Sequence, residues 1–489
     1  MHHSDHVVPA EPRPLPDGPL YFVGIGGAGM SSIAQVLAER GRRISGADPG
    51  ISPAVKERLQ AYGILVYTQH DARQIEDAVA VVVSDAIPAA NPEVQAAQAK
   101  GLPIFRRPEV LGSIVNASRG IAIAGTHGKT TTTGMVASIL LAAGLDPTIL
   151  IGGDLPAIGG NARNGESKFV VAESCEAYDG FLYLHPEIAV VLNVEADHLD
   201  YHGDEAHVIA SFERFLAQTA ARRRKTKKGD IILCWDDALT RKVRSKSIET
   251  ISTLYGIGSK PGISVKAVDV TQGSQPSFRI WRAWYPQEEP IGPIRLNVPG
   301  EHNIRNALAA ACVGLALNVA HEHIIAGLEA FTGTGRRFER LGEAHGVLIV
   351  DDYAHHPTEI RATLAAARSA YPDRRLVAVF QPHLPSRTRD NMDAFADALM
   401  AADVVYVTDI YLAREQPIPG VSSEILVNGI RALRPDIAAA YVPDKNELPA
   451  RLAADVQQGD FVLTMGAGDI RKAGEGLLAA LQTGEDSGG

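Results

Sequence analysis

The sequence predicts an α/β protein of three domains, each built around a mostly parallel sheet. Its 489 residues correspond to about three domains of ordinary size. Short apolar runs of strand length alternate with segments of helical periodicity, and several of these runs end in glycines or polar residues. With 45% hydrophobic and 21% charged residues, the composition is that of a soluble globular protein. We therefore expect doubly wound sheets, which bind ligands at the carboxyl ends of their strands.

Charge, hydropathy and cysteine content exclude several classes of protein. The formal net charge of −10 argues against general binding of nucleic acid. No apolar run is long enough to span a membrane. Residues 1–19 lack the apolar core of a signal peptide and are expected to be a disordered lead-in. The cysteines are far apart, which argues against disulfides or a cysteine zinc site and suits a reducing cytoplasm: Cys175, Cys234 and Cys312.

The first domain is predicted at residues 20–113 and begins with a strand at 20–24. The strand runs into a full G-x-G-x-x-G, and a helix at 30–40 and a second strand at 43–48 follow. That second strand ends in Asp48, about 20 residues past the glycines, as a dinucleotide-binding fold requires. Taken alone, the motif favours NAD or FAD, with a pyrophosphate on the helix N-terminus. The glycines would equally suit close packing of the strand against the helix.

Three more strands complete the first domain. They are predicted near 64–67, 79–84 and 101–105. Ser84 begins a loop at the carboxyl end of one of them, and a linker helix begins at Arg106. Ser84 is therefore expected on the edge of the sheet where a ligand would bind.

The second domain, predicted at residues 114–332, opens with a strand at 121–124 followed by Gly125, Gly128 and Lys129. A Gly-rich turn between a strand and a helix N-terminus directs backbone N–H groups at an anion. Lys129 adds a charge for a β- or γ-phosphate, and the next residue is a threonine whose hydroxyl suits Mg²⁺. The segment therefore predicts a nucleoside triphosphate site. Its spacing departs from the standard phosphate loop, since Ile123 replaces the first glycine, and the plain alternative is an ordinary strand–turn–helix connection.

A metal site is predicted beside this loop. Strands at 168–173 and 187–193 end near Glu173 and His198, and the carboxyl ends of parallel strands gather at one edge of a sheet. A carboxylate and an imidazole can share a Mg²⁺ or Mn²⁺ site, although His is a less usual ligand of Mg²⁺. The alternative for His198 is a surface residue with no ligand.

The rest of the second domain gives weaker signals. The basic run at 222–228 is expected to be a solvated helix end or loop, and a short strand follows at 230–235. Alternating residues at 264–297 predict antiparallel strands at a sheet edge. A helix opens near residue 300 and carries two asparagines, which would either contact a base or ribose or cap the helix: Asn303 and Asn306.

The third domain, predicted at residues 333–489, begins after a basic loop at 333–340. Strands are expected at 346–350, 375–380, 404–408 and 461–465, separated by helical stretches. Polar segments follow the first two strands, at 351–358 and 381–387, which indicates a third α/β unit with its own strand-end loops. Residues 484–489 are expected to be a frayed tail.

Taken together, these motifs resemble the Mur ligase family, and most of all its members that attach L-alanine to UDP-N-acetylmuramate. The matching segments follow one another over nearly the whole chain: GIGGAGM at 24–30, GTHGKTTT at 125–132, NVEADH at 193–198, GEHNIRN at 300–306, GRRF at 335–338, DDYAHHP at 351–357, QPH at 381–383 and MGAGD at 465–469. As a set, they are far more specific than any one of them.

The resemblance implies roles for individual residues. The UDP-sugar would be bound by Gly24, Gly26, Gly27, Ala28, Gly29, Asp48, Ser84 and His127. ATP would be bound by Gly125, Thr126, His127, Gly128, Lys129, Thr130, Thr131, Asn303, Asn306, Arg337 and Asp352. Metal ligands would be Thr130, Glu173 and His198. The amino acid would be bound by Tyr353, His355, His383 and Arg387. The catalytic residues would be Lys129, His198, Arg337, His355 and Arg387.

The resemblance also implies a fold and a reaction. It implies a Rossmann-like UDP-binding domain, a central ATPase domain of the phosphate-loop type and a Rossmann-like C-terminal domain that binds the amino acid. The substrates would be ATP, UDP-N-acetylmuramate and L-alanine, with Mg²⁺ or Mn²⁺ as cofactor and an acyl phosphate as intermediate. Such a ligase serves cytoplasmic peptidoglycan precursor synthesis and would be a monomer or weak homodimer, without nucleic acid or membrane partners. Positioning and charge stabilisation, rather than a protein nucleophile, would supply most of the catalysis.

Two departures from the family pattern concern the site. After Glu173, the family usually continues with further acidic residues, whereas this chain has fewer acidic residues in the same segment, which ends at Tyr178. The family usually has an arginine after Gln-Pro-His, where this chain has Leu384. The second departure leaves open how strictly L-alanine is preferred to serine or glycine.

Three other functions remain to be weighed. A ligase that recycles a preformed tripeptide would share the phosphate loop, but it usually lacks the GIGGAGM and Gln-Pro-His segments found here. A nicotinamide-dependent oxidoreductase would explain residues 24–48 but leaves Lys129 and the third domain without a role. A non-catalytic sensor of UDP-sugars would need a broken ATP site, and the residues of that site are present.

Overall fold

The structure, a computed structural model, describes residues 13–197, 199–226, 229–244, 248–258, 260–413 and 415–483. It divides the chain into two compact units. The first unit takes in the chain up to Val270 with Phe278–Ile294 and Ile304–Phe331, and the second takes in Thr271–Ser277, Arg295–Asn303 and the chain from Thr332 onward. The predicted tail and most of the predicted lead-in lie outside the described residues. Within these residues, every helix is too short or too polar to cross a membrane.

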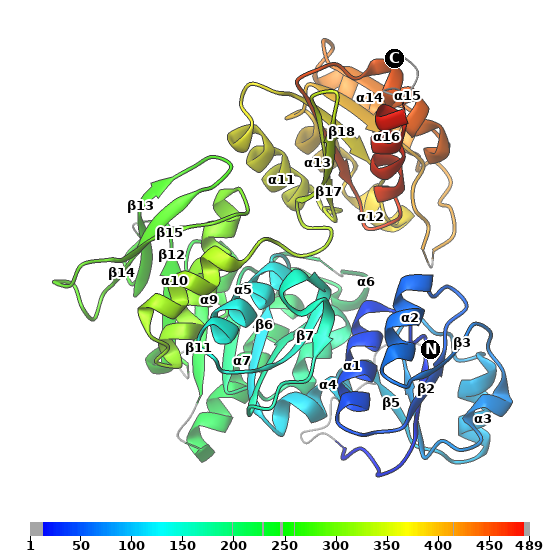
Figure 1. Ribbon diagram of the computed structural model, residues 1–489, viewed down its shortest axis with the longest axis vertical. Coiled ribbons are helices and arrows are strands. Elements are labelled where there is room, and N and C mark those ends of the chain that lie inside the picture. The colour runs from blue at the N-terminus through cyan, green and yellow to red at the C-terminus, as the bar shows by residue number, and fades with distance from the viewer. Residues whose placement is uncertain are drawn as a thin grey trace. The chain divides into compact units, whose positions relative to one another are not determined.

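Five parallel strands form the first sheet, in the order β3-β2-β1-β4-β5. The strands are β1 (Leu20–Val23), β2 (Ile44–Ala47), β3 (Leu65–Tyr67), β4 (Ala80–Val83) and β5 (Ile104–Arg106). The helices are α1 (Ala28–Glu39), α2 (Pro53–Ala61), η2 (Ala72–Ile75), α3 (Pro92–Ala99) and α4 (Arg107–Asn116) (Figure 1). The strand order reverses between β1 and β4, which is the point where such sheets bind ligands. The predicted Rossmann-like arrangement is confirmed.

Ten strands form the central sheet, in the order β15-β14-β13-β12-β11-β10-β6-β9-β7-β8. From β7 to β13 every neighbouring pair is parallel, and β8 is antiparallel to β7. The strands are β6 (Arg119–Ala124), β7 (Thr148–Leu155), β8 (Gly160–Arg163), β9 (Phe169–Glu173), β10 (Ile188–Val191), β11 (Asp230–Cys234), β12 (Ser252–Gly256), β13 (Val265–Thr271), β14 (Ser277–Arg282) and β15 (Ile291–Arg295). The predicted mostly parallel sheet is confirmed.

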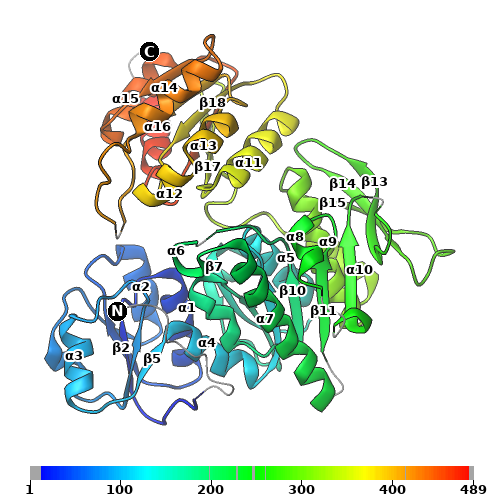
Figure 2. The same cartoon turned by 180° about the vertical axis from the view of Figure 1, so that it is seen from behind.

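Helices pack on both faces of this sheet. They are α5 (Lys129–Ala142), η3 (Pro156–Ile158), η4 (Ala177–Tyr183), α6 (Leu199–His202), α7 (Glu205–Thr226), α8 (Ala238–Lys242), η5 (Glu249–Ile251), α9 (Glu301–Ala316) and α10 (His321–Ala330). Helix α7 lies over β10 and β11 (Figure 2) and buries Phe212, Phe215 and Leu216, whose spacing places them on one helix face. Helix α10 packs closely on α5, because Gly327 leaves no room for a side chain: an added Cβ would lie 2.4 Å from the Ile139 Cα.

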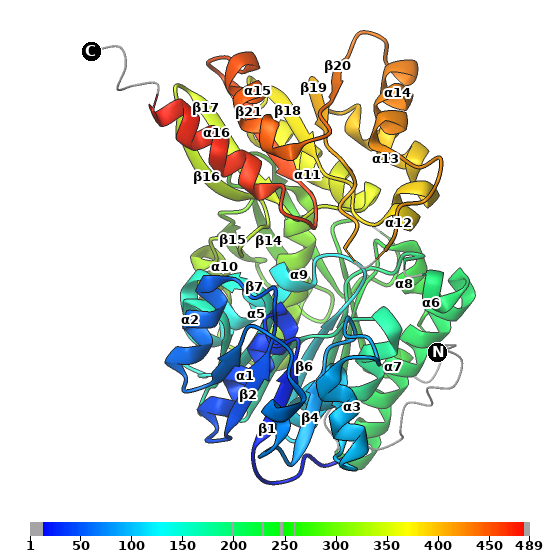
Figure 3. The same cartoon turned by 90° about the vertical axis from the view of Figure 1, so that its right-hand side faces the viewer.

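Six strands form the third sheet, in the order β16-β17-β21-β18-β19-β20. Only β16 is antiparallel to its neighbour. The strands are β16 (Glu339–Ala344), β17 (Val347–Asp352), β18 (Arg375–Phe380), β19 (Val404–Val407), β20 (Ala438–Tyr441) and β21 (Asp460–Met465). The helices are α11 (Pro357–Ala370), α12 (Pro385–Asp390), α13 (Met392–Leu399), α14 (Ser423–Leu433), η6 (Lys445–Glu447), α15 (Leu448–Asp455) and α16 (Arg471–Thr483). Helices α13 and α14 cover one face of the sheet, and α15 and α16 cover the other (Figure 3).

Several strands were not predicted from the sequence. Strand β7 contains Gly-Gly-Asp, which looks like a turn, β16 is mostly polar, and β20 is rich in alanine. The predicted basic loop at 333–340 is wrong at its end, because β16 begins at Glu339. The polar segment after β18 contains helix α12, which begins at Pro385.

Strands β13, β14 and β15 lie at one end of the central sheet, as predicted. The residues that join them, 272–276 and 283–290, are too few for the crossover that a parallel pair requires. The position of these strands at an edge of the sheet and their short connections both agree with the prediction of antiparallel strands at 264–297.

Candidate active site

The G-x-G-x-x-G loop lies at the carboxyl end of β1 and is held by Asp48. The Asp48 carboxylate accepts hydrogen bonds from the Gly26 N–H at 3.0 Å and the Gly50 N–H at 2.8 Å. Gly24 has a φ of 82°, which glycine adopts without strain, and an added Cβ there would lie 3.1 Å from the Ser84 Cβ. The predicted loop residues Gly24–Gly29, Asp48 and Ser84 are thus brought together where the strand order reverses.

The second glycine-rich turn connects β6 to α5. Gly125 and Gly128 have φ values of 136° and 81°, in the backbone region that favours glycine. Thr130 and Thr131 follow Lys129 in the first turn of α5, and both threonines are buried. The first N–H groups of a helix have no acceptor within the helix, so this turn is built to receive an anion.

The Lys129 ammonium group is held inside this turn. It donates hydrogen bonds to the carbonyls of Gly125 and Thr126 and to the Glu176 carboxylate, the last at 2.9 Å. Although burial alone lowers the pKa of Lys129, the Glu176 charge raises it above its usual range. Glu176 is itself buried. It was not among the predicted site residues, although it stands in the segment whose acidic pattern appeared thin.

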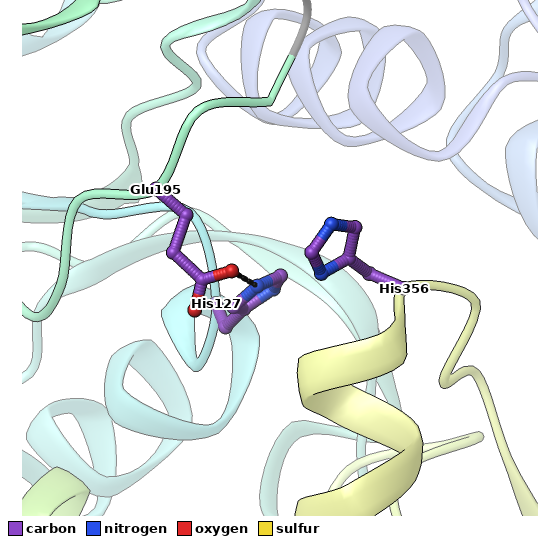
Figure 4. A group of neighbouring side chains, drawn as sticks. All are labelled: His127, Glu195 and His356. Atoms are coloured by element: carbon purple, nitrogen blue, oxygen red, sulfur yellow. Dashed lines mark ion pairs between the residues drawn. The ribbon is translucent and has the colours of Figure 1, made fainter. Parts of the chain in front are cut away.

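Asn193, in the segment that follows β10, connects this segment to the phosphate loop by hydrogen bonds. The His127 N–H donates to the Asn193 Oδ1 at 2.8 Å, and the Asn193 Nδ2 donates back to the His127 carbonyl at 3.1 Å. The Glu195 N–H donates to the Thr126 Oγ1 at 2.9 Å, and the Glu195 carboxylate lies 3.3 Å from the His127 Nε2 (Figure 4). Asn193 and Glu195 were absent from the predicted site, although the NVEADH segment contains both.

Glu173 stands beside the loop as the last residue of β9. In the pairing of β9 with β6, Glu173 is opposite Ile123, one residue before β6 ends. Its carboxylate accepts a hydrogen bond from the Gly152 N–H at 2.6 Å. A carboxylate and the Thr130 hydroxyl are oxygen ligands of the kind that Mg²⁺ prefers, so this donor set fits the predicted metal. The third predicted ligand, His198, lies outside the described residues.

The two asparagines of α9 differ in their contacts. Asn303 is buried, and its Nδ2 donates to the Pro299 carbonyl at 2.7 Å. Asn306 lies against the phosphate loop, because a Cβ added to Gly128 would be 2.7 Å from the Asn306 Oδ1. Asn306 therefore joins the loop residues of the first unit.

In the second unit, Asp352 ends β17 and holds the backbone on both sides of it. Its carboxylate accepts hydrogen bonds from the Phe338 N–H and the Ala354 N–H, each at 2.7 Å. Burial raises the pKa of Asp352 to about 6, and the Arg337 guanidinium limits the rise. The Arg337 guanidinium lies 5.2 Å from the centre of the Tyr353 ring. Two charged groups predicted to serve ATP thus lie at the same strand end.

The four residues predicted to bind the amino acid are neighbours within the second unit. The rings of Tyr353 and His355 lie 5.2 Å apart, and those of His355 and His383 lie 5.8 Å apart. The Arg387 Nη1 lies 3.4 Å from the His383 Nδ1. The His355 Nδ1 lies 3.2 Å from the Glu359 carboxylate, which was not predicted. The cluster thus combines two imidazoles, a phenol and a guanidinium.

Leu384, which replaces the usual arginine, has an unusual backbone conformation. Its φ is 67°, a value that strains a branched side chain, and the side chain is buried. The Leu384 N–H donates to the Tyr411 carbonyl at 3.0 Å, and its own carbonyl accepts from the Thr388 N–H of α12. The residue therefore contributes backbone geometry to the turn that leads to Arg387.

Arg336 is a structural residue that the sequence did not single out. Its guanidinium donates to the carbonyls of Gly466 and Gly468 at 2.7 and 2.9 Å and to the Asp351 carboxylate at 3.1 Å. It therefore ties the loop after β21 to the end of β17. The only signal for it was its place beside Arg337 in the GRRF segment.

Comparison with known proteins agrees with this arrangement. Residues 19–119 match the model of the "Mur ligase family, catalytic domain", residues 123–314 match the "Mur ligase middle domain", and residues 336–468 match the "Mur ligase, glutamate ligase domain". The UDP-N-acetylmuramate–L-alanine ligase of Trichlorobacter lovleyi is 43% identical over 463 residues, which cover 94% of this chain and 98% of the relative. That of Oleidesulfovibrio alaskensis is 44% identical over 459 residues, with coverage of 94% and 98%.

A solved structure extends the comparison to the fold. The UDP-N-acetylmuramate–alanine ligase of Thermotoga maritima superposes with a TM-score of 0.80 and 26% identity, and the match covers 95% of this chain and 99% of that one. The murein peptide ligase of Psychrobacter arcticus has the same fold, with a TM-score of 0.68, 23% identity and coverage of 95% and 98%. Since the three family models follow one another along the chain, and relatives above 40% identity match it almost from end to end, the chain belongs to the Mur ligase family.

Proposed function

We propose that this protein is an ATP-dependent ligase that joins L-alanine to the lactyl carboxylate of UDP-N-acetylmuramate. The observation that carries the proposal is the phosphate loop around Lys129, in a chain that aligns along its length with relatives bearing that name. The reaction would serve peptidoglycan precursor synthesis in the cytoplasm, with the protein as a monomer or weak homodimer.

In this proposal, the first sheet binds the nucleotide-sugar. The pyrophosphate lies on the N-terminus of α1, with the G-x-G-x-x-G residues Gly24, Gly26, Gly27, Ala28 and Gly29, together with Asp48 and Ser84, around it. Asp48 supports this role because its carboxylate accepts a hydrogen bond from the Gly26 N–H and so holds the loop at the end of β1. His127 takes the muramoyl side of the substrate. We place this domain at residues 20–113.

The central domain, placed at residues 114–332, binds ATP. Its proposed ligands are Gly125, Thr126, His127, Gly128, Lys129, Thr130, Thr131, Asn303 and Asn306. Thr130, Glu173 and His198 are the proposed ligands of Mg²⁺ or Mn²⁺, which when bound neutralises phosphate charge. Lys129 suits contact with a phosphate because it is already charged and held within the loop. To reach a phosphate, it exchanges its Glu176 partner for the ligand.

The C-terminal domain, placed at residues 333–489, contributes charge and the second substrate. Arg337 contacts the γ-phosphate, and Asp352 accepts a hydrogen bond from the ribose. Tyr353, His355, His383 and Arg387 surround L-alanine, whose carboxylate pairs with the Arg387 guanidinium. The contacts among these four side chains support a shared role.

The proposed reaction has two steps. A lactyl carboxylate oxygen attacks the γ-phosphorus of ATP, the bond to ADP breaks, and an acyl phosphate forms. The alanine amine then attacks the acyl carbon, loses a proton, and inorganic phosphate leaves as the amide forms. Lys129 and Arg337 offset the negative charges that otherwise keep carboxylate and ATP apart, and His355 takes the amine proton.

The test is phosphate release from ATP in the presence of UDP-N-acetylmuramate and candidate acceptors. We expect release with L-alanine, much less with the free tripeptide, and none in Lys129→Ala, and the release with serine and glycine measures how strictly L-alanine is preferred. Release with the tripeptide alone would instead assign the chain to peptide recycling. Absence of release with every acceptor would contradict the proposed ligase.

A further inference from the structure

Helix α1 packs against the edge of the central sheet through a row of polar groups. The helix contacts β7 and β8 within the first unit. Four of the groups recur every three or four residues and so lie on one face of the helix, and the C-cap residue Arg40 follows them: the Ala28 carbonyl, Ser31, Gln35 and Glu39. Since α1 carries the proposed pyrophosphate loop at its N-terminus, this row fixes the loop relative to the central domain.

Asn161 of β8 provides the contact at the end of the row next to the loop. Its Nδ2 donates to the Ala28 carbonyl at 2.9 Å and lies 3.4 Å from the Ser31 Oγ. One turn further along, the Gln35 Nε2 donates to the Ala162 carbonyl at 2.9 Å. Asn161 and Gln35 are each 2% exposed, so the side chains that donate these hydrogen bonds are buried.

The other side of the Asn161 amide is unusual. Its Oδ1 is buried and has no hydrogen-bond partner in the part of the chain that the structure describes. The acceptor at Ala28 fixes which side of the amide carries the hydrogens. A buried carbonyl oxygen without a donor lowers stability, and the Ala28 carbonyl also accepts from the Ser31 Oγ at 3.1 Å, so an apolar residue of similar size would suit the fold about as well. Stability of the domain interface therefore does not explain an asparagine here.

The place of the Asn161 contact suggests its purpose. Ala28 is the first residue of α1 and belongs to the G-x-G-x-x-G loop, four residues after Gly24. A hydrogen bond to its carbonyl holds the first turn of the helix, whose N–H groups face the proposed pyrophosphate.

We infer that Asn161 is a positioning residue for the nucleotide-sugar site, which sets the first turn of α1 for pyrophosphate binding from the neighbouring domain. The inference rests on the proposed function. It assigns to β8, an edge strand of the ATP-binding sheet, a role in binding the other substrate.

The chain offers a matched control in Asn164. This residue is also an asparagine at the same interface, but it meets the far end of α1. Its Oδ1 accepts from the Arg40 Nε at 2.8 Å, and its N–H donates to the Glu39 carboxylate at 3.0 Å. The two ends of the row are about 18 Å apart along the helix.

The test compares Asn161→Leu, Asn161→Asp and Asn164→Leu with the wild-type protein. Each is assayed for KM of UDP-N-acetylmuramate and of ATP, for direct binding of UDP-N-acetylmuramate by calorimetry, and for thermal unfolding. We expect both Asn161 variants to raise the KM and Kd of the nucleotide-sugar by roughly two- to tenfold, the change that corresponds to one neutral hydrogen bond. Their KM for ATP and the unfolding temperature of Asn161→Leu should stay at wild-type values, as should both KM values of Asn164→Leu.

Three results would overturn the inference. They are an unchanged KM for UDP-N-acetylmuramate in both Asn161 variants, an equal rise in both KM values, and a loss of stability with unchanged KM. The last two would make Asn161 an ordinary interface residue. A wild-type protein that is inactive with UDP-N-acetylmuramate would refute the proposed function itself, so the two failures are distinguishable.

Discussion

The ion pair between Lys129 and Glu176 gives a prediction whose size follows from the structure. The two groups are 2.9 Å apart, with 16% and 5% of their side chains exposed. The perturbations are Lys129→Met, Glu176→Gln and the double variant, each of which removes charge while keeping the approximate size of the side chain. Together they form a double-mutant cycle that isolates the interaction between the two charges.

At an effective dielectric constant of about 20, two unit charges at this separation attract each other by about 6 kcal/mol. The loss of water around both groups offsets a large part of this energy, so we expect a coupling of roughly 2–3 kcal/mol. Lys129→Met leaves Glu176 buried without a partner and should lower the free energy of unfolding the most, by about 3 kcal/mol. Glu176→Gln should cost less, about 1–2 kcal/mol, because Lys129 keeps two carbonyl acceptors.

The assay is urea unfolding of the four proteins, with circular dichroism as the measure of the folded fraction. The double variant should be more stable than the sum of the single changes predicts, with a loss of about 2 kcal/mol that lies between the losses of the two single variants. Asp71→Asn is a suitable control, since its pair with Arg73 is exposed and should contribute little to stability. Strict additivity of the two changes would show that the charges do not interact, and the description of the loop would then be wrong.

Three further predictions concern the substrates. Lys129→Ala should abolish phosphate release but leave the Kd for UDP-N-acetylmuramate unchanged in calorimetry, because the proposed sites lie on different sheets; retained turnover would contradict the loop assignment. Arg387→Ala should weaken the binding of L-alanine by about 2–5 kcal/mol, as expected when one side of a buried charge pair is removed, and so raise the KM for L-alanine with little change in the KM for ATP. A KM for L-alanine equal to that of the wild-type protein would place the alanine carboxylate elsewhere. The Asp352 pKa of about 6 lies above the ordinary value of 3.8, so stability from its protonated form is complete below the lower value and is lost as pH rises through the higher one. Since an ionised carboxylate accepts a stronger hydrogen bond from a ribose hydroxyl than the protonated acid does, the KM for ATP should rise as pH falls through about 6 in the wild-type protein but not in Asp352→Asn, and identical pH profiles would refute the ribose contact.

Most of the strands that the sequence predicted share one property. Strands β6, β10, β17 and β21 are continuous apolar runs because parallel strands are buried on both faces, and such runs are easily recognised. Strands that depart from this pattern were missed: β7 contains two glycines and an aspartate, and β20 lies at an edge with little apolar area. Their pairing depends on neighbours that are distant in sequence, which local patterns do not report.

The candidate site shows the same division. The glycines and Lys129 indicate the phosphate loop from the sequence alone, because the backbone freedom of glycine and the charge of lysine are properties of the residue types themselves. Glu176, Asn193 and Arg336 gain their roles only through contacts with residues far along the chain, to Lys129, His127 and Gly466. Asn161 lies in β8, which was not predicted, so its contact with α1 could not be predicted from the sequence either.

The most direct test of the proposed ligation follows an oxygen atom. UDP-N-acetylmuramate labelled with heavy oxygen in its lactyl carboxylate is incubated with ATP, Mg²⁺ and L-alanine, and both products are analysed by mass spectrometry. Ligation through an acyl phosphate predicts that one labelled oxygen appears in the released phosphate, and that the nucleotide-sugar becomes heavier by one alanine residue. Unlabelled phosphate, or a nucleotide-sugar that gains no alanine, would contradict the account.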